Sequence, residues 1–261
     1  MTFIITLIAW ILERFFHWHH LKRWEWFTHY EKWLSVHIKT WQPYLRLLIN
    51  VLPPLMVVGF INVLLSSFLY GIFKFIFGVF VLLYCLGPEN LWVEVYQKIE
   101  QNHKGEKKAV DHVEYFHEKF VRSIFIKAND RIFAVMFWFV LLGPIGAVLY
   151  RLIDIFSVRE EYGLMPIAVQ SKQVLDWIPI RIFTFFFALG GHFTDVIGIW
   201  KKHFTQGLEM NEFLLTECGM AALDRESPNQ DISSLGKDAL GLLDRAFVMG
   251  LVVLAICVLI L

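Results

Sequence analysis

Three residues that could bind a ligand lie at the start of an apolar run. The segment LDWIPIRIFTFFFALGGHF, residues 175–193, holds Asp176, Pro179 and Arg181. Proline suits the first turn of a helix and aspartate suits the N-cap, so we expect a helix to begin here. A guanidinium beside hydrocarbon needs an anion. Arg181 therefore either pairs with Asp176 or a glutamate and pins the helix at the interface, or lines an anion-binding cleft.

A second set of residues brackets the apolar segment IFAVMFWFVLLGPIGAVLY, residues 132–150. The flanking residues are Asp130, Arg131, Tyr150 and Arg151. Charged residues at the ends of a span commonly anchor it at the interfaces, although an acid such as Asp130 could instead be buried and functional. Within the segment, a Gly-Pro-x-Gly motif predicts a kink and a close helix approach. The motif comprises Gly143, Pro144 and Gly146.

A third set has the spacing of metal ligands. Glu13, His17 and His20 fall at i, i+4 and i+7, on one face of a helix, and could hold a metal ion. The same spacing is common in a helix of the headgroup region, and no cysteine or second carboxylate is fixed beside these residues. The sequence has no glycine-rich phosphate loop, G-x-S-x-G elbow, CxxC pair or HExxH motif. Any metal or other cofactor therefore stays unassigned.

The composition requires a membrane to accommodate these segments. Hydrophobic residues make up 57% of the chain and charged residues 18%, whereas soluble domains are nearer one half and one quarter. The apolar residues gather in runs that a soluble protein would have to expose. The formal net charge is zero and no long block has a single sign, which excludes the basic surface of a nucleic-acid-binding protein. The three cysteines are isolated and form no metal or disulfide framework.

These patterns predict an all-α, polytopic membrane protein with four to five membrane segments, folded as a single domain over residues 1–261. The expected membrane spans are residues 45–66, 68–86, 132–150 and 247–261, and residues 1–16 are expected to form a short first membrane helix that is tilted or partly interfacial. Residues 178–200 fit a re-entrant segment and a full span equally well, because His192 and Asp195 interrupt them. Amphipathic helices are expected in the more polar stretches, residues 17–43, 88–130 and 201–246.

The motifs themselves resemble a known family. LIAWILERFF, FWFVLLGPIGAVLYRLID and above all VLDWIPIRIFTFFFALGGHF are similar to the AmpE family, and the similarity covers most of the chain in order. Members of that family are inner-membrane proteins associated with induction of chromosomal β-lactamase in Gram-negative bacteria. The resemblance implies a multi-pass protein of the bacterial inner membrane with a functional link to the AmpD amidase pathway of cell-wall recycling.

The AmpE family is in turn similar to the CbiB/CobD cobinamide-phosphate synthases. The positions that match the synthase pattern are Asp130, Gly143, Pro144, Gly146, Tyr150, Arg151, Pro179 and Arg181. The acidic motifs of the synthases are largely missing. Ile126-Lys127 stands where they carry Glu-Asn, and Lys172-Gln173 stands where they carry Asp-Asp. A phosphate-handling ligase needs such acids for Mg²⁺ and for acid–base chemistry, so we expect no cobinamide synthesis.

The resemblance and the residues together favour a regulatory or signalling protein that binds an anionic ligand at an arginine-lined membrane cleft. A cell-wall fragment or a nucleotide would fit such a cleft. The residues expected to form it are Arg181, Arg151, Tyr150, Asp130, Asp176 and His192, with Pro179, Gly143, Pro144 and Gly146 as structural positions. Two alternatives stay open: a divergent CbiB-like transferase or ligase with an amphiphilic substrate, and a transporter of wall fragments.

Overall fold

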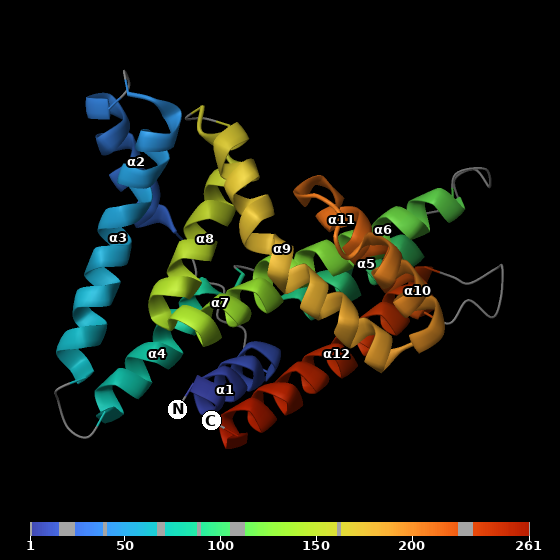
Figure 1. The fold of residues 1–261 in the computed structure, drawn as a ribbon. Coiled ribbons are helices and arrows are strands. Elements are labelled where there is room, and N and C mark those ends of the chain that lie inside the picture. Colours follow the sequence, from blue (N-terminus) through green and yellow to red (C-terminus); the bar gives the residue numbers. More distant parts are fainter. Residues whose placement is uncertain are drawn as a thin grey trace. The chain divides into compact units, whose positions relative to one another are not determined.

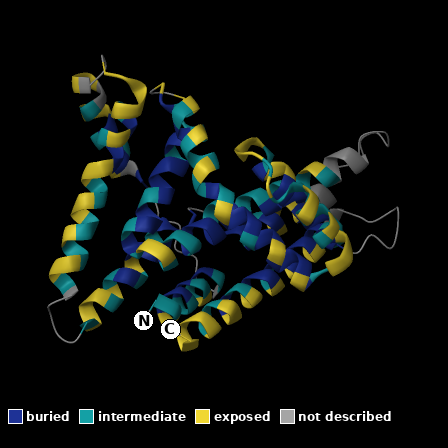
Figure 2. Ribbon diagram, viewed as in Figure 1, coloured by how far each residue is buried: buried dark blue, intermediate teal, exposed yellow. Residues whose placement is uncertain are grey.

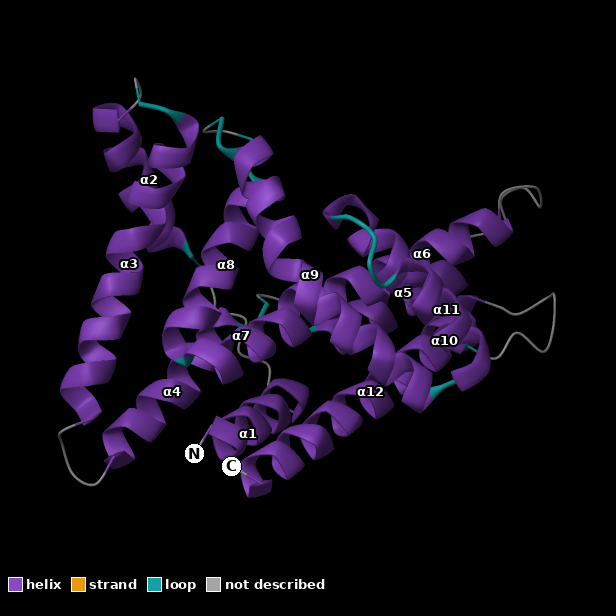
Figure 3. Cartoon of the chain, viewed as in Figure 1, coloured by secondary structure: helices purple, strands orange, loops and turns teal. Residues whose placement is uncertain are grey.

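A computed structural model of the chain describes helices throughout (Figure 3). The described ranges are residues 2–15, 24–38, 41–66, 71–87, 90–104, 113–160, 163–223 and 232–260. Within these ranges every regular element is helical, which confirms the predicted all-α class.

The chain divides into two compact units, each built from two separate stretches. Unit 1 comprises Met1–Pro88 and Ala134–Asp176, and unit 2 comprises Glu89–Phe133 and Trp177–Leu261. The helices of unit 1 are α1 (Thr2–Phe15), α2 (Glu25–Ile38), α3 (Pro43–Ser66), α4 (Ile72–Cys85), α7 (Ala134–Leu142) and α8 (Pro144–Val158). Those of unit 2 are α5 (Leu91–Lys104), α6 (Val113–Ala128), the π-helical turn η3 (Asn129–Phe133), α10 (Phe193–His203), the short η4 (Leu208–Met210), α11 (Asn211–Ala222) and α12 (Ile232–Ile260). Helix α9 (Met165–Gly190) begins in unit 1 and ends in unit 2.

Unit 1 packs α4 between its neighbours, with α1, α3, α7 and α8 all in contact with it (Figure 1). Gly78 allows α1 to approach α4, because a Cβ there would lie 3.0 Å from Ile5 Cδ1. Aromatic rings close the unit on the side of α2, where Phe27 contacts Phe156 of α8 at a centroid distance of 5.4 Å. The core of unit 1 therefore joins the N-terminal helices to α8.

Unit 2 is organised around a cluster of phenylalanines. Phe183 of α9 lies 4.3 Å from Phe133 and 5.4 Å from Phe247, measured between ring centroids. Phe187, one turn further along α9, lies 4.5 Å from Phe183 and 5.2 Å from Phe125 of α6. The apolar end of α9 is thus held by α6, η3 and α12.

Three described helices are long and apolar enough to cross a membrane: Pro43–Leu65, Met165–Gly190 and Ser234–Ile260. Ile72–Cys85 is a shorter apolar helix. Most of α3 and the C-terminal half of α12 leave their apolar side chains exposed, as lipid-facing helices do (Figure 2). The final apolar helix begins well before Phe247, so part of the stretch expected to be soluble belongs to α12.

The expected span over residues 132–150 is interrupted rather than kinked. Helix α7 ends at Leu142, Gly143 adopts a positive φ of 67°, and Pro144 begins α8 at its first helical position. A left-handed conformation of this kind is strained for a residue with a side chain, which explains the glycine. Gly146 is equally constrained, because a Cβ there would lie 2.2 Å from the carbonyl oxygen of Trp138.

The expectation that a helix begins near Pro179 is wrong, since α9 runs unbroken from Met165 to Gly190 with Pro179 inside it. Proline lacks an N–H, so the carbonyl of Leu175 loses its helical partner. Trp138 supplies the replacement, because its Nε1–H donates to the Leu175 carbonyl at 3.2 Å. Asp176 is consequently a mid-helix residue and not an N-cap.

Candidate functional site

A row of polar side chains joins α8 to α9 within unit 1. Tyr150 and Asp154 lie one turn apart on α8, and Lys172 and Asp176 lie one turn apart on α9. The Tyr150 hydroxyl donates to Asp176 Oδ1 at 2.7 Å, and Lys172 Nζ lies 2.9 Å from Asp154 Oδ1. The pairing runs in opposite directions along the two helices, as expected for antiparallel neighbours. Polar contacts between apolar helices fix their register.

Arg151 extends this row and is its most deeply placed cation. It is 6% exposed, and its Nη1 lies 2.8 Å from Asp154 Oδ2. Asp154 is therefore shared by two cations, Arg151 and Lys172. The Nε of Arg151 is buried and has no hydrogen-bond partner within the described part of the chain. A buried N–H without a partner is costly, so this atom is a natural point for a ligand oxygen.

Arg181 has a different role, because the surrounding backbone takes its hydrogen bonds. Its Nε donates to the Phe204 carbonyl at 2.7 Å, and its Nη2 donates to the Gln206 carbonyl at 2.9 Å. Its Nη1 donates to the Trp177 carbonyl at 2.8 Å and to Asn211 Oδ1 at 2.9 Å. These contacts use four of the five N–H donors of a guanidinium. The guanidinium also stacks on Trp177 at 4.1 Å.

The predicted pairing of Arg181 with Asp176 or a glutamate is not observed, since its described partners are neutral. Arg181 instead ties α9 to the segment that leads into α11. Trp200 reinforces the tie, because its Nε1–H donates to the Arg181 carbonyl at 3.0 Å. This arginine therefore positions backbone.

The two remaining residues of the predicted cleft lie on other elements of unit 2. Asp130 belongs to η3, where its Oδ1 accepts a hydrogen bond from Asn129 Nδ2 at 3.2 Å. His192 is exposed at the N-terminus of α10, and its backbone N–H donates to the Ala222 carbonyl at 3.4 Å. The contacts that the structure describes thus join Tyr150 with Asp176, and Arg151 with Asp154, while Arg181 has its own set of partners.

The metal hypothesis for the first helix is not decided. Glu13 is buried, whereas His17 and His20 lie outside the described residues. No group of three or more potential metal ligands occurs among the residues that the structure does describe.

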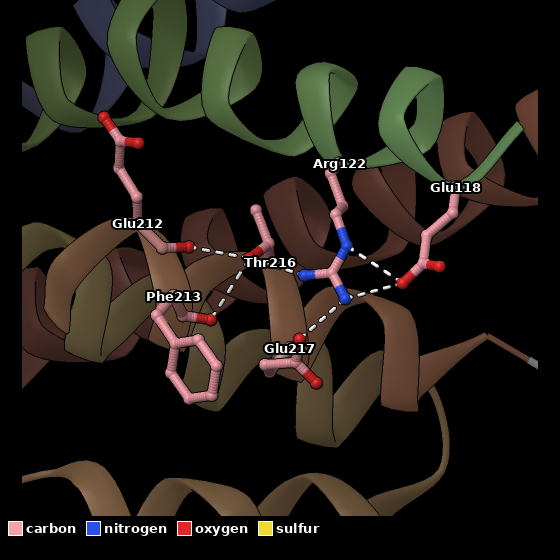
Figure 4. A network of polar contacts seen from close by, with 6 residues as sticks. All are labelled: Glu118, Arg122, Glu212, Phe213, Thr216 and Glu217. Atoms are coloured by element: carbon pink, nitrogen blue, oxygen red, sulfur yellow. Dashed lines mark hydrogen bonds and ion pairs between the residues drawn. The ribbon is translucent and has the colours of Figure 1, made fainter. Parts of the chain in front are cut away.

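A second polar network, shown in Figure 4, connects α6 to α11 in unit 2. Arg122 Nη2 lies 2.7 Å from Glu118 Oε1 and 2.6 Å from Glu217 Oε1, and its Nη1 donates to Thr216 Oγ1 at 3.0 Å. Burial alone would lower the pKa of Arg122, but hydrogen bonds to the two carboxylates raise it above its ordinary value. The charge of this arginine is already neutralised within the chain, so the network fastens the two helices.

Sequence reasoning did not assign Lys172, Asp154 or Asn211 to the site. Two of them could have been found, because Arg151 and Asp154 are spaced i, i+3 and Lys172 and Asp176 are spaced i, i+4 in helical segments. Asn211 carries no such signal, since it lies 30 positions from Arg181.

Comparisons with known proteins agree with the resemblance seen in the motifs. Three curated relatives are named cobalamin biosynthesis protein CobD, one of them as probable. The relative from Chromobacterium violaceum is 27% identical over 109 residues, which cover 40% of this chain and 35% of the relative. The relative from Pyrococcus furiosus is 24% identical over 168 residues (57% and 59%), and that from Stutzerimonas stutzeri is 28% identical over 87 residues (30% and 28%).

The chain thus matches less than two thirds of the length of each of these relatives. No solved structure matches it significantly. By contrast, the model of one family, described as regulatory signalling modulator protein AmpE, matches residues 1–261. The protein therefore belongs to the AmpE family of regulatory signalling modulators and, like the family, is a protein of the inner membrane.

Proposed function

We propose that this protein regulates the induction of β-lactamase by detecting an anionic product of cell-wall recycling at the membrane. The observation that carries the regulatory role is the family match over the entire chain. A wall fragment or a nucleotide is the class of ligand that suits the chemistry, because both carry carboxylate or phosphate groups.

The polar row of unit 1 supports a site for that ligand. Arg151 offers a buried guanidinium whose Nε has no described partner and whose counterion, Asp154, is shared with Lys172. An entering carboxylate or phosphate would accept from this Nε and relieve the cost of burying it. Tyr150 and Asp176 lie on the same two helices and would complete the polar lining. Among the predicted cleft residues, Arg151 is therefore the centre of the proposed site.

The test is inducible β-lactamase activity in a strain that lacks this protein. Wild-type protein should restore the normal response to an inducing β-lactam. Arg151→Gln should reach the membrane at wild-type level. It should restore less than about a tenth of the difference in β-lactamase induction between the deletion strain and the wild-type strain. A hydrogen bond between charged groups contributes about 1.5–3 kcal/mol, so its loss should lower the affinity for the ligand by roughly tenfold to hundredfold.

Two further variants make this test specific. Asp154 keeps Lys172 as a partner in Arg151→Gln, so the substitution does not strand a buried carboxylate. Arg159→Gln removes another arginine, half-exposed at the end of α8, and should restore induction fully. Full restoration by Arg151→Gln would contradict the ligand site, and an unchanged response in the deletion strain would contradict the regulatory role.

The similarity to proteins named for cobalamin biosynthesis favours one rival, a transferase or ligase acting on an amphiphilic substrate. Such an enzyme would depend on carboxylates, and Asp130 and Asp176 are the acids at the matching motifs. Asp130→Asn and Asp176→Asn should then each abolish output in the induction assay. Wild-type output from both variants would eliminate this rival and leave the regulatory role intact.

A further inference from the structure

A second charged cluster lies in unit 2, where three cationic side chains meet one carboxylate. Lys98 Nζ lies 3.0 Å from Glu94 Oε1, Lys127 Nζ contacts the same oxygen, and Arg131 Nη1 lies 2.8 Å from Oε2. We call these four residues the Glu94 cluster. It shares no residue with the site proposed for the regulatory ligand.

The local sequence explains why these side chains converge. Asn90 Oδ1 accepts from the backbone N–H of Trp92 at 3.0 Å and caps the start of α5, which places Glu94 in the first turn. Lys98 follows four positions later on the same face. Lys127 and Arg131 are also four positions apart, at the end of α6 and in η3, and α5 contacts α6. Helix α5 thus contributes two of the four charged residues, and α6 and η3 contribute one each.

The charges within the Glu94 cluster do not balance. Lys98 and Lys127 share the Glu94 carboxylate as their described counterion, so two lysine charges meet one negative charge. Glu94 remains ionised at neutral pH, because although burial raises its pKa, the contacts with Lys127, Lys98 and Arg131 lower it to about 2. Burial lowers the pKa of Lys127 below its ordinary value, the contact with Glu94 partly offsets this decrease, and the charges of Lys98 and Arg131 add to it. One carboxylate therefore neutralises the two lysines incompletely.

The cluster is also open to a ligand from solvent. The side chain of Lys98 is 47% exposed and that of Lys127 is 29% exposed, whereas that of Glu94 is 16% exposed. The carboxylate thus forms the floor and the lysines form the accessible rim. Arg131 lies on a π-helical turn, an irregularity that often occurs at functional positions.

We propose that the Glu94 cluster binds a phosphate group, carried either by an anionic lipid or by a free phosphorylated molecule. Lysine and arginine N–H groups are the preferred donors to phosphate oxygens, and clustered basic residues beside membrane helices attract anionic headgroups. Glu94 holds the three cations together when no ligand is bound and competes with the ligand for them.

Because Glu94 competes with the ligand, its removal should change the phosphate affinity in the direction opposite to the one expected for a purely structural role. Removing the cations weakens phosphate binding, and removing the competing carboxylate strengthens it. If the cluster only fastened α5 to α6, Glu94→Gln would loosen the helices and any phosphate binding would fall with it. The direction of the Glu94→Gln effect therefore separates the two roles.

The experiment uses full-length protein purified in a neutral detergent. Native mass spectrometry counts the phosphatidylglycerol molecules that the protein retains, relative to phosphatidylcholine. In a separate titration, inorganic pyrophosphate is added and the thermal unfolding midpoint is followed. Whichever of the two probes binds the wild-type protein, the double variant Lys98→Gln, Lys127→Gln should bind it about tenfold or more weakly. Glu94→Gln should bind the same probe roughly threefold more tightly. The control Lys119→Gln, Lys237→Gln removes two exposed lysines outside the cluster and should bind as wild type does.

Preference for phosphatidylglycerol with no response to pyrophosphate identifies a lipid headgroup as the ligand. A response to pyrophosphate without lipid preference identifies a free phosphorylated molecule. Absence of both in the wild-type protein, equal binding by the double variant and its control, or weaker binding by Glu94→Gln would overturn the proposal. None of these results bears on Arg151, so failure here leaves the regulatory proposal standing.

Discussion

Single residues in this protein resolve the conflict between charge and burial in three different ways. Arg181 donates its hydrogen bonds to backbone carbonyls and to Asn211, and so holds α9 against the segment before α11. Arg151 shares one carboxylate with Lys172 and keeps a buried Nε without a described partner. Glu94 gathers three cations at once. Only the second and third arrangements have capacity left for a ligand, which is why the proposals rest on them and not on Arg181.

The ionisation of Glu94 predicts how stability depends on pH. Its pKa is lowered in the folded protein from 4.5 to about 2, so folding favours the charged form. The stabilisation is fully present above about pH 4.5 and is lost as pH falls toward 2. Its magnitude is of order 2 kcal/mol, equivalent to a decrease of about 5 °C in the thermal midpoint. Thermal unfolding in detergent at pH 7 and at pH 3 measures this decrease.

The comparison that isolates Glu94 from the other carboxylates is Glu94→Gln. This variant should be less stable than wild type at pH 7 and should show a smaller loss between pH 7 and pH 3. Equal losses in the two proteins would mean that Glu94 does not contribute to the acid sensitivity.

At the scale of an element, another helix supplies a hydrogen bond that α9 lacks at Pro179. Pro179 removes one helical hydrogen bond, and Trp138 of α7 donates to the carbonyl that is left without a partner. Trp138→Phe should destabilise the protein by about 1 kcal/mol, because it leaves the partly buried carbonyl of Leu175 without its indole donor. In Pro179→Ala the backbone N–H of residue 179 restores the helical bond, so Trp138→Phe should cost markedly less in that background. A double-mutant cycle of thermal stability measures the difference.

Additive effects in this cycle would show that Trp138 does not replace the missing bond. Trp177→Phe provides a control, because the Trp177 indole donates at 3.4 Å to the carbonyl of Gln206, outside α9. Its effect should be the same with Pro179 or with alanine at that position.

The same helix shows what could be predicted from sequence and what could not. Apolar periodicity and length predicted the helical class, and the expected segments 45–66 and 68–86 agree closely with α3 and α4. The helix start expected near Pro179 is wrong because Trp138, which donates to the carbonyl that Pro179 leaves without a helical partner, lies 37 positions from Leu175. Three of the four described hydrogen-bond partners of Arg181 lie 23 to 30 positions away, and most of the four are backbone carbonyls, which leave no mark on side-chain patterns. Local signals predicted the elements, and contacts between distant segments decided their limits and the roles of their charges.

At the scale of the whole molecule, α9 decides how the chain is threaded through the membrane. Sequence patterns left a re-entrant segment and a full span equally open for residues 178–200, but α9 has 26 residues, about 39 Å at 1.5 Å per residue. This length exceeds the hydrocarbon thickness of about 30 Å. Its apolar part also includes Arg181, whose charge the chain itself solvates. We therefore expect α9 to cross completely.

Labelling of single cysteines from one side of the membrane tests this crossing. Cys85, Cys218 and Cys257 are free and would first be replaced by serine or alanine. Glu160→Cys then places a thiol before α9, and Asp195→Cys places one after it, both at exposed positions. A membrane-impermeant maleimide added to intact spheroplasts should label one of the two, and the other should react only after permeabilisation. Labelling of both thiols from the same side would establish a re-entrant α9. Residues 191–223 would then lie on the same side of the membrane as the start of α9, and α12 would begin on that side.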